Sequence, residues 1–424
     1  MGNKRNKIYI IDVTNRDGVQ TSRLGLAKLE KTIINFYLNN MGICQSEFGF
    51  PFTNHEVNYL KANLELAKMG VLQPILLSGW CRAVKDDVKR ALALGVEYLN
   101  ISISTSSQMV KGKFGSRVVR NPEDNSRKPS IIGMMVETLE EAKAGGIKVV
   151  GVNAEDASRT DDEFLVKFSR IAKEHGADRI RYCDTLGYDD PFTIYNRVKS
   201  LAKKIGIPIE MHCHNDLGLA VACSVAGAKG AIDAGVDAYI NTSINGMGER
   251  AGNADLISVI LALRKSSGLK DLNFLDERVD LSRAWKIAKY ASYAFGVPIP
   301  VNQAGVGGNA FAHESGIHAD GALKDRRNYE LYNFEELGRG EPEIIETGRK
   351  ITTGEYGGIK GFRNVYEKLE IEFKDRKEAS KILELARYAN VHTQKPLTDD
   401  ELLFIAHYPE QARQILTVSP PNLD

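Results

Sequence analysis

The sequence has little cysteine, no excess of either charge and no long hydrophobic run. Its five cysteines are an odd number without a Cys-x-x-Cys pair, which excludes a disulfide framework and favours reduced thiols. Lysine plus arginine (56) nearly balance aspartate plus glutamate (55), so nothing points to nucleic acid or an anionic membrane as a partner. No apolar segment reaches the ~18 residues of a membrane helix, and residues 1–13 contain no signal-peptide stretch. We therefore expect a cytoplasmic protein.

Short β-branched runs alternate with longer amphipathic ones as far as residue 270. The longer runs place apolar residues three and four apart, as in 26–38, and several end at glycine, as at Gly42 and Gly70. Repeated units of strand and helix on this scale predict a (β/α)8 TIM barrel, whose typical size is ~250 residues. A doubly wound open sheet is the alternative, although it seldom needs so many units. The eight expected strands cover residues 7–14, 43–50, 74–80, 98–104, 148–153, 179–184, 207–214 and 238–243.

The alternation ends near Gly268, and we divide the chain there. Residues 1–270 are expected to form the catalytic barrel, 271–360 a linker or lid subdomain, and 361–424 a C-terminal helical subdomain. A helix is predicted over residues 275–296. The fold class is thus a TIM barrel with appended, mainly helical C-terminal subdomains.

A glycine-rich segment at residues 305–321 belongs to the predicted lid. It lacks the strand and the lysine of a phosphate-binding loop, so we do not assign it that role. His313 and His318 in this segment fit a lid that carries a proton-transfer group to the barrel.

The predicted seventh strand ends in His212-Cys213-His214. Because side chains alternate along a strand, His212 and His214 point to one face, together with Glu210. Two neighbouring imidazoles can bind a divalent metal with one or two additional oxygen ligands. Buried histidines that are hydrogen-bonded within a core are the other interpretation of this pair.

Active sites of (β/α)8 barrels lie at the carboxyl ends of the strands. Most of the unusual polar residues of this sequence follow those ends, so they are expected to meet at one mouth of the barrel. Any one of them alone could be a helix cap or a turn residue. They are Arg16, Asp17, Gln20, Glu47, Glu155, Asp156, Arg159, Asp184, Thr185, His212, His214, Asn245, Glu249, Arg250 and Asn253.

Asp17, His212, His214 and the carbonyl of Asn253 would supply two nitrogen and two oxygen ligands. This mixed set suits Mn²⁺, which we expect, and also Co²⁺, Zn²⁺ or iron, with Mg²⁺ tolerated. An open position beside Arg16 would bind an α-keto acid and polarise its ketone. A carbanion formed from a thioester methyl group could then attack that ketone.

Five motifs, in order along residues 7–360, resemble the isopropylmalate, homocitrate and citramalate synthase family. Its members condense acetyl-CoA with an α-keto acid on a metal-bearing barrel. The matching segments are 12–20 (DVTNRDGVQ), 155–161 (EDASRTD), 212–220 (HCHNDLGLA), 245–253 (NGMGERAGN) and 313–321 (HESGIHADG).

The resemblance implies roles for individual residues. Residues that match Asp17, His212 and His214 bind the metal in this family, and the Asn253 position often joins them. The match to Arg16 places it against the keto acid and the nascent alkoxide. The keto-acid pocket is expected to be lined by Gln20, Arg159 and Thr185.

The acid/base machinery of the family includes a residue like His318, often from the neighbouring subunit. Glu210, in a Glu-x-His-x-His arrangement of homocitrate synthases, is expected to work with it. The resemblance thus implies a homodimer that shares its lid. The family's catalytic tyrosine has two candidates here, Tyr329 and Tyr356.

Departures from the family pattern bear on the substrate. Asn15 and Val19 interrupt the first motif, and the cations Arg23 and Arg159 favour a keto acid with a second carboxylate. We expect oxaloacetate, giving citrate and CoA, with 2-oxoglutarate as the near alternative. An isopropylmalate or citramalate synthase and an acyl-CoA lyase are further alternatives. Lyases of this kind carry a reactive cysteine near the last strand, and residues 245–253 contain none.

Overall fold

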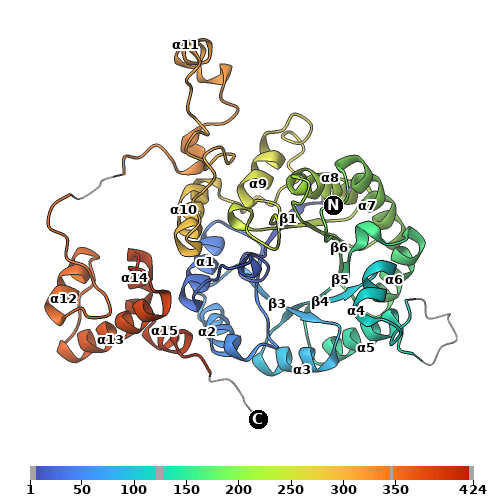
Figure 1. Ribbon diagram of the computed structural model, residues 1–424, viewed down its shortest axis with the longest axis horizontal. Helices are drawn as coiled ribbons and strands as arrows, with labels where there is room; N and C mark the ends of the chain where they lie inside the picture. The colour runs from blue at the N-terminus through green and yellow to red at the C-terminus, as the bar shows by residue number, and fades with distance from the viewer. Residues whose placement is uncertain (1–5, 121–127, 344–346, 420–424) are drawn as a thin grey trace, which may run out of the picture.

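The computed structural model describes residues 6–120, 128–343 and 347–419. Eight parallel strands close into one barrel in chain order, with helices around it (Figure 1). This confirms the predicted (β/α)8 barrel and excludes the open sheet. The strands are β1 (Ile8–Asp12), β2 (Gln45–Gly49), β3 (Leu76–Arg82), β4 (Tyr98–Ser104), β5 (Val149–Glu155), β6 (Arg179–Asp184), β7 (Ile209–Cys213) and β8 (Ala238–Thr242).

Helices follow every strand, and the connection after β4 carries an extra one. The barrel helices are α1 (Lys28–Asn40), α2 (Val57–Lys68), α3 (Lys85–Leu94), α4 (Ser107–Phe114), α5 (Ile131–Ala144), α6 (Asp162–Glu174), α7 (Pro191–Ile205), α8 (Ala220–Asp233) and α9 (Leu256–Lys265). Beyond them lie α10 (Ala284–Phe295), α11 (Gly316–Lys324), α12 (Ile359–Lys368), α13 (Arg376–Thr393), α14 (Asp399–His407) and α15 (Pro409–Leu416).

The barrel strands are buried on both faces, as parallel strands covered by helices must be. On β6, Ile180 and Tyr182 alternate with Arg179, Arg181 and Cys183, and all five are buried. Arg181 hydrogen-bonds to Glu47 of β2, which is not a neighbour of β6, so the odd-numbered side chains of β6 point into the barrel. The barrel interior therefore contains charged side chains as well as apolar ones.

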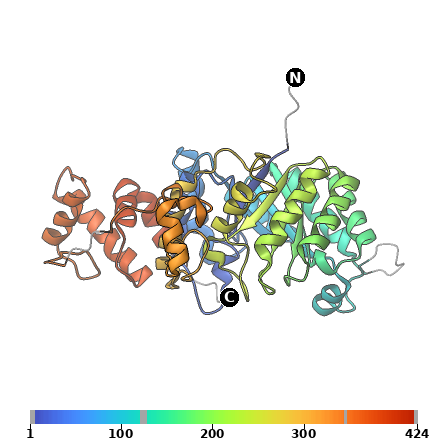
Figure 2. The same cartoon turned by 90° about the horizontal axis from the view of Figure 1, so that it is seen from above.

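Of the C-terminal helices, α10, α13, α14 and α15 pack against one side of the barrel (Figures 1 and 2). α10 contacts α1, and α15 contacts α2. Polar contacts support this packing, because Tyr290 of α10 donates a 2.8 Å hydrogen bond to Glu401 of α14. The helix predicted over 275–296 begins only at α10, since Asp280 caps a preceding short 3₁₀ turn through Ser282.

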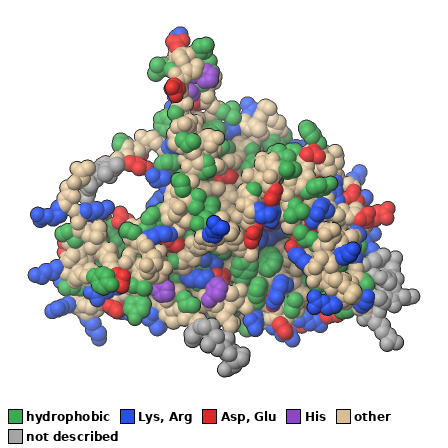
Figure 3. Space-filling model, viewed as in Figure 1, with side chains coloured by type: hydrophobic (Ala, Val, Ile, Leu, Met, Phe, Trp, Pro, Cys, Tyr) green, Lys and Arg blue, Asp and Glu red, His purple; other side chains and the backbone are tan. Residues whose placement is uncertain are grey.

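The segment with α11 projects from the body of the molecule (Figure 1). No residue of α11 is buried. Figure 3 shows histidine and hydrophobic side chains on this projecting end. Within the described ranges, none of the helices is both long and apolar enough to cross a membrane. All five cysteines are buried and free, as predicted.

Candidate metal centre and active site

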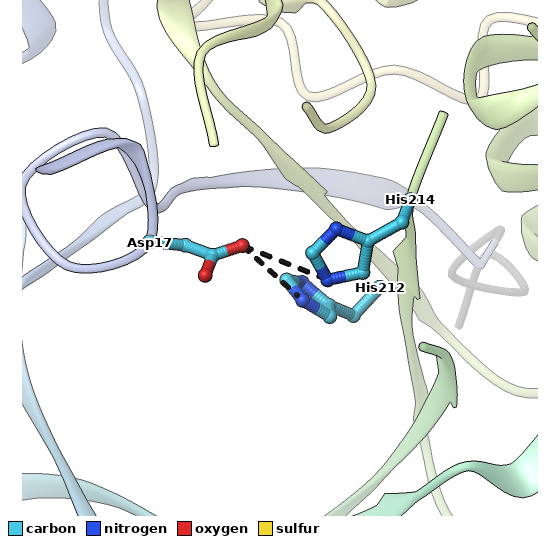
Figure 4. Close-up of side chains that lie close together, drawn as sticks. All are labelled: Asp17, His212 and His214. Carbon is cyan, nitrogen blue, oxygen red and sulfur yellow. Dashed lines mark ion pairs between the residues drawn. The ribbon is translucent and has the colours of Figure 1, made fainter. Parts of the chain in front are cut away.

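Asp17, His212 and His214 point toward one another at the carboxyl end of the barrel (Figure 4). The Asp17 Oδ2 atom lies 3.6 Å from His212 Nε2 and 3.8 Å from His214 Nε2. All three side chains are buried. Residues almost two hundred positions apart in the sequence are thus brought together because β1 and β7 both flank β8 in the closed barrel.

These three residues fit a divalent metal ion. A metal with bonds of ~2.1 Å holds neighbouring ligand atoms ~3.0–3.4 Å apart, so the Asp17 oxygen would need to come only a few tenths of an ångström closer to each histidine nitrogen. Burial by itself would raise the pKa of Asp17, but the neighbouring Arg16 guanidinium lowers it well below its ordinary range. Burial lowers the pKa of both histidines. An ionised carboxylate and two neutral imidazoles are the protonation states that a metal requires.

Asn253 adjoins the three residues as a hydrogen-bond donor. Its Nδ2 atom donates to Asp17 Oδ2 at 2.8 Å and to the Met247 carbonyl at 3.1 Å. The Asn253 Oδ1 atom is buried and has no hydrogen-bond partner. Direct ligation by this oxygen stays a prediction, since it requires the amide to turn.

Arg16 is fixed beside the three residues by two carboxylates. Its Nε atom donates to Glu47 Oε2 at 2.6 Å, and its Nη1 atom lies 3.1 Å from Asp17 Oδ1. The guanidinium also lies over the Trp80 ring, 5.7 Å from its centroid. Burial would raise the pKa of Glu47, but Arg16 and Arg181 hold it at about 2. The Arg16 guanidinium is thus held by ionised partners before any substrate binds.

A cavity of about 240 Å³ opens at this centre. Its wall combines the predicted metal ligands Asp17, His212 and His214 with Arg16, Gln20 and Thr185, so six of the ten predicted site residues meet there. The other lining residues are Trp80, Ser102, Asn153, Glu155, Arg181, Cys183, Glu249 and Arg250.

Arg159 does not line this cavity. Its guanidinium makes hydrogen bonds of 2.7, 3.0 and 3.1 Å to the Asp156 carboxylate. Asp156 in turn donates its backbone N–H to Thr185 Oγ1 at 2.9 Å. Arg159 therefore lies beside the pocket wall, one residue behind Thr185, and its contact with substrate stays a prediction.

His318 and Glu210 also do not line the cavity. His318 is on α11, where its ring stacks on Tyr329 with centroids 4.2 Å apart. Glu210 is fully buried in β7 and does not line the cavity. Of the two tyrosine candidates, Tyr329 is packed against His318, whereas Tyr356 is 91% exposed.

Sequence reasoning missed Arg181 and Asn241. Arg181 lines the cavity and binds Glu47, while Asn241 faces His212 Nδ1 at 3.1 Å. The alternation of side chains along a strand was the one signal that could have found them. A residue two positions from an inward-facing residue also faces inward. Arg179 and Cys183 flank Arg181 in this way.

Comparisons with known proteins agree with this geometry. Residues 7–290 match the HMGL-like family, and residues 306–393 match a family described as homocitrate synthase post-HMGL domain-like. The chain belongs to the HMGL-like family. Citrate (Re)-synthase of Dehalococcoides mccartyi is 59% identical over 98% of this chain and 99% of its own length.

More distant members of the family are also named as synthases. 2-Isopropylmalate synthase 2 of Caldanaerobacter subterraneus is 38% identical over 96% of this chain and 97% of its own length. Homocitrate synthase 1 of Nostoc sp. is 34% identical over 94% and 96%, respectively. The synthase family predicted from the five motifs is therefore confirmed. The chain is an acyltransferase of the acetyl-CoA-dependent type.

Solved structures support the fold. The HMG-CoA lyase of Bacillus subtilis superposes with a TM-score of 0.55 at 17% identity, covering 70% of this chain and 97% of the lyase. The HMG-CoA lyase of Pseudomonas aeruginosa gives a TM-score of 0.55, also at 17% identity, over 70% and 95%. At this identity the likeness shows the fold alone.

Proposed function

We propose that the protein condenses acetyl-CoA with oxaloacetate in a divalent-metal-dependent reaction that releases citrate and CoA. The observation that carries this proposal is the 59% identity with a citrate (Re)-synthase over nearly the whole of both chains. The cluster of the buried side chains Asp17, His212 and His214 in the wall of the cavity supports the metal requirement. Mn²⁺ is the ion we expect, because mixed nitrogen and oxygen ligation suits it.

Different residues of the cavity would serve different steps of the reaction. When bound by Asp17, His212 and His214, the metal would polarise the ketone of the keto acid. Arg16 presents the remaining N–H groups of its guanidinium to the carboxylate of the keto acid and to the alkoxide that develops. A base removes a proton from the methyl carbon of the thioester, and this carbon forms the new bond to the ketone carbon, whose oxygen takes up a proton. Hydrolysis of the thioester then releases CoA.

A second carboxylate on the substrate needs a cation within reach. Arg250 lines the cavity, where it pairs with Asp216 at 2.8 Å. Arg159, which the sequence favoured for this role, would have to leave Asp156 to reach the cavity. We propose both arginines as candidates for the distal carboxylate.

A panel of keto acids tests the substrate. Free thiol is measured with acetyl-CoA, Mn²⁺ and, in turn, oxaloacetate, 2-oxoglutarate, 2-oxoisovalerate and pyruvate. We expect thiol release with oxaloacetate and its loss after chelation of the metal. Release with 2-oxoglutarate alone would contradict the citrate assignment and favour a homocitrate synthase. Release that survives chelation would contradict the metal requirement.

We further propose a homodimer in which α11 of one copy completes the active site of the other. Within a single chain, Ile317 is 75% exposed and Leu323 is 89% exposed, although both are apolar. His318 lies on α11, which projects from the barrel (Figure 1), and it does not line the cavity of its own chain. A second copy would cover the apolar side chains and bring His318 to a cavity as an acid/base group.

Free, buried thiols support the cytoplasmic location that we propose.

A further inference from the structure

Four buried side chains form a connected group inside the barrel, which we call the inner network: Glu47, Arg181, Glu210 and Asn241. They come from β2, β6, β7 and β8, and each is at most 1% exposed. Arg181 joins the two carboxylates, since its Nη2 atom donates to Glu47 Oε1 at 2.7 Å and its Nε atom to Glu210 Oε1 at 2.7 Å. The network lies one step deeper in the barrel than His212, because Glu210 precedes it by two residues on the same face of β7.

Glu210 makes its hydrogen bonds to other members of the inner network. Its Oε1 atom accepts from Arg181 and also from Asn241 Nδ2 at 2.7 Å. The residue does not line the cavity. A proton-transfer group must reach the proton that it moves directly or through one water. Glu210 lacks that access, so its contacts point to a different role.

Asn241 links Glu210 to His212, because its side chain contacts both residues. An oxygen that accepts hydrogen bonds from a guanidinium faces the NH₂ end of an amide, which fixes the Asn241 side chain with Nδ2 toward Glu210. The Oδ1 end then lies 3.1 Å from His212 Nδ1. An amide oxygen can only accept, so this contact is a hydrogen bond only when His212 carries its proton on Nδ1. The Nε2 lone pair faces Asp17, 3.6 Å away.

The second histidine of the pair has no such support. His214 Nδ1 is buried and without a hydrogen-bond partner. The two imidazoles are therefore unequal, and only His212 has its tautomer set by a buried partner. This asymmetry makes His214 an internal reference for any measurement on His212.

We propose that Glu210 and Asn241 are positioning residues that hold His212 with its proton on Nδ1 and its Nε2 lone pair directed at the metal position. The proposal rests on the proposed function in one respect, that a divalent ion is what Nε2 binds. It replaces the acid/base role that the sequence suggested for Glu210. Outer partners of metal-binding histidines commonly act in this way.

Histidine NMR of the metal-free protein tests the tautomer directly. Two-bond ¹H–¹⁵N spectra of ¹⁵N-histidine-labelled protein distinguish protonation at Nδ1 from protonation at Nε2. The His212 signals are assigned by their absence in His212→Gln. We expect the Nδ1–H form in the wild type and a mixture of tautomers in Asn241→Leu. An Nε2–H form in the wild type would overturn the proposal.

Titration with Mn²⁺ alone, without substrate, tests the consequence for binding. Loss of an outer-shell partner typically weakens metal affinity ~10–100-fold, and we expect that loss in both Asn241→Leu and Glu210→Gln. The double variant should be no weaker than the poorer single variant, because the two residues act through one chain of contacts. Unchanged affinity in Glu210→Gln together with lost turnover would restore the acid/base role and overturn ours.

Asn63→Leu is the matched control. Asn63 is a fully buried asparagine between α1 and α2, where its Nδ2 atom donates to Thr32 Oγ1 at 3.0 Å. We expect this variant to lose stability without any change in Mn²⁺ affinity or in the His212 spectrum. An equal loss of affinity in the control would show that the effect is general destabilisation. If the wild type failed to bind Mn²⁺, the proposed function would fail, while the NMR spectrum would still decide the tautomer.

Discussion

Asp17 and His212 carry the largest predicted effects of single residues. Replacing either with alanine removes a ligand from the three-residue cluster, whereas the barrel core is built mainly by other side chains. We expect Mn²⁺ binding and metal-dependent turnover to fall by more than the ~100-fold that an outer-shell change produces. Metal content after dialysis and thiol release measure the two effects.

The control for His212→Ala is His175→Ala. His175 lies at the end of α6 and pairs with Glu140 at 2.8 Å, away from the cavity. We expect this variant to bind metal and turn over like the wild type. Wild-type metal content in Asp17→Ala would remove Asp17 from the site.

Arg181→Lys tests the bridging role of a guanidinium. Lysine keeps the charge but cannot donate to Glu47 and Glu210 in the forked geometry of arginine. Glu47 and Glu210 are fully buried, and each would lose hydrogen bonds that offset the cost of burying its charge. We therefore expect the free energy of unfolding to fall by about 3 kcal/mol. Urea denaturation measures it. Arg170→Lys on α6, outside the cavity wall and the inner network, should change stability by less than about 0.5 kcal/mol.

At the scale of elements, the pairing of α1 with α2 depends on Glu56. This buried carboxylate, at the start of α2, accepts from Lys31 at 2.8 Å and also binds Lys28. Burial would raise the pKa of Glu56, but the two lysines lower it from 4.5 to about 2. A depressed carboxyl pKa stabilises the fold above pH 4.5, and that stability is lost as the pH falls toward 2.

Glu56→Gln should therefore destabilise the protein at neutral pH by on the order of 3 kcal/mol and make its stability less dependent on pH in the acid range. Urea denaturation at pH 7 and at a series of values down to pH 3 measures both effects. Glu65→Gln, on the exposed face of α2, is the control and should leave the pH profile unchanged. A Glu56→Gln profile that matches the wild type would contradict the assignment.

The regular barrel elements could be predicted from the sequence, but the inner network could not. Short β-branched runs that alternate with amphipathic segments indicated all eight strands. α4 was missed because it buries only Val110 and so lacks an amphipathic pattern. Arg181 and Glu47 meet across the barrel although 134 positions separate them, and no local pattern pairs two such residues.

The candidate site was predictable to the extent that its residues follow strand ends. Asp17, His212 and His214 lie at the carboxyl ends of β1 and β7, where the barrel brings them together. Arg159 is a rim residue too, but Asp156 holds its guanidinium beside the cavity. A sequence pattern cannot show which partner a long side chain selects.

At the scale of the whole molecule, a shared site can be tested by mixing two inactive proteins. Asp17→Ala lacks the metal site, and His318→Ala lacks the proposed acid/base group on α11. If each α11 serves the other copy, mixed dimers contain one site with both residues intact. Equal mixing after subunit exchange should then restore about a quarter of wild-type activity. No recovery in dimers shown to be mixed would contradict the shared site.

The proposed function depends most on one claim, that Asp17, His212 and His214 bind the same cation. Anomalous diffraction at the manganese edge from crystals grown with Mn²⁺ tests it most directly. We predict a single strong peak at the barrel mouth, ~2.0–2.3 Å from Asp17 Oδ2, His212 Nε2 and His214 Nε2. A peak elsewhere, or none at this position while the protein is active with Mn²⁺, would contradict the claim.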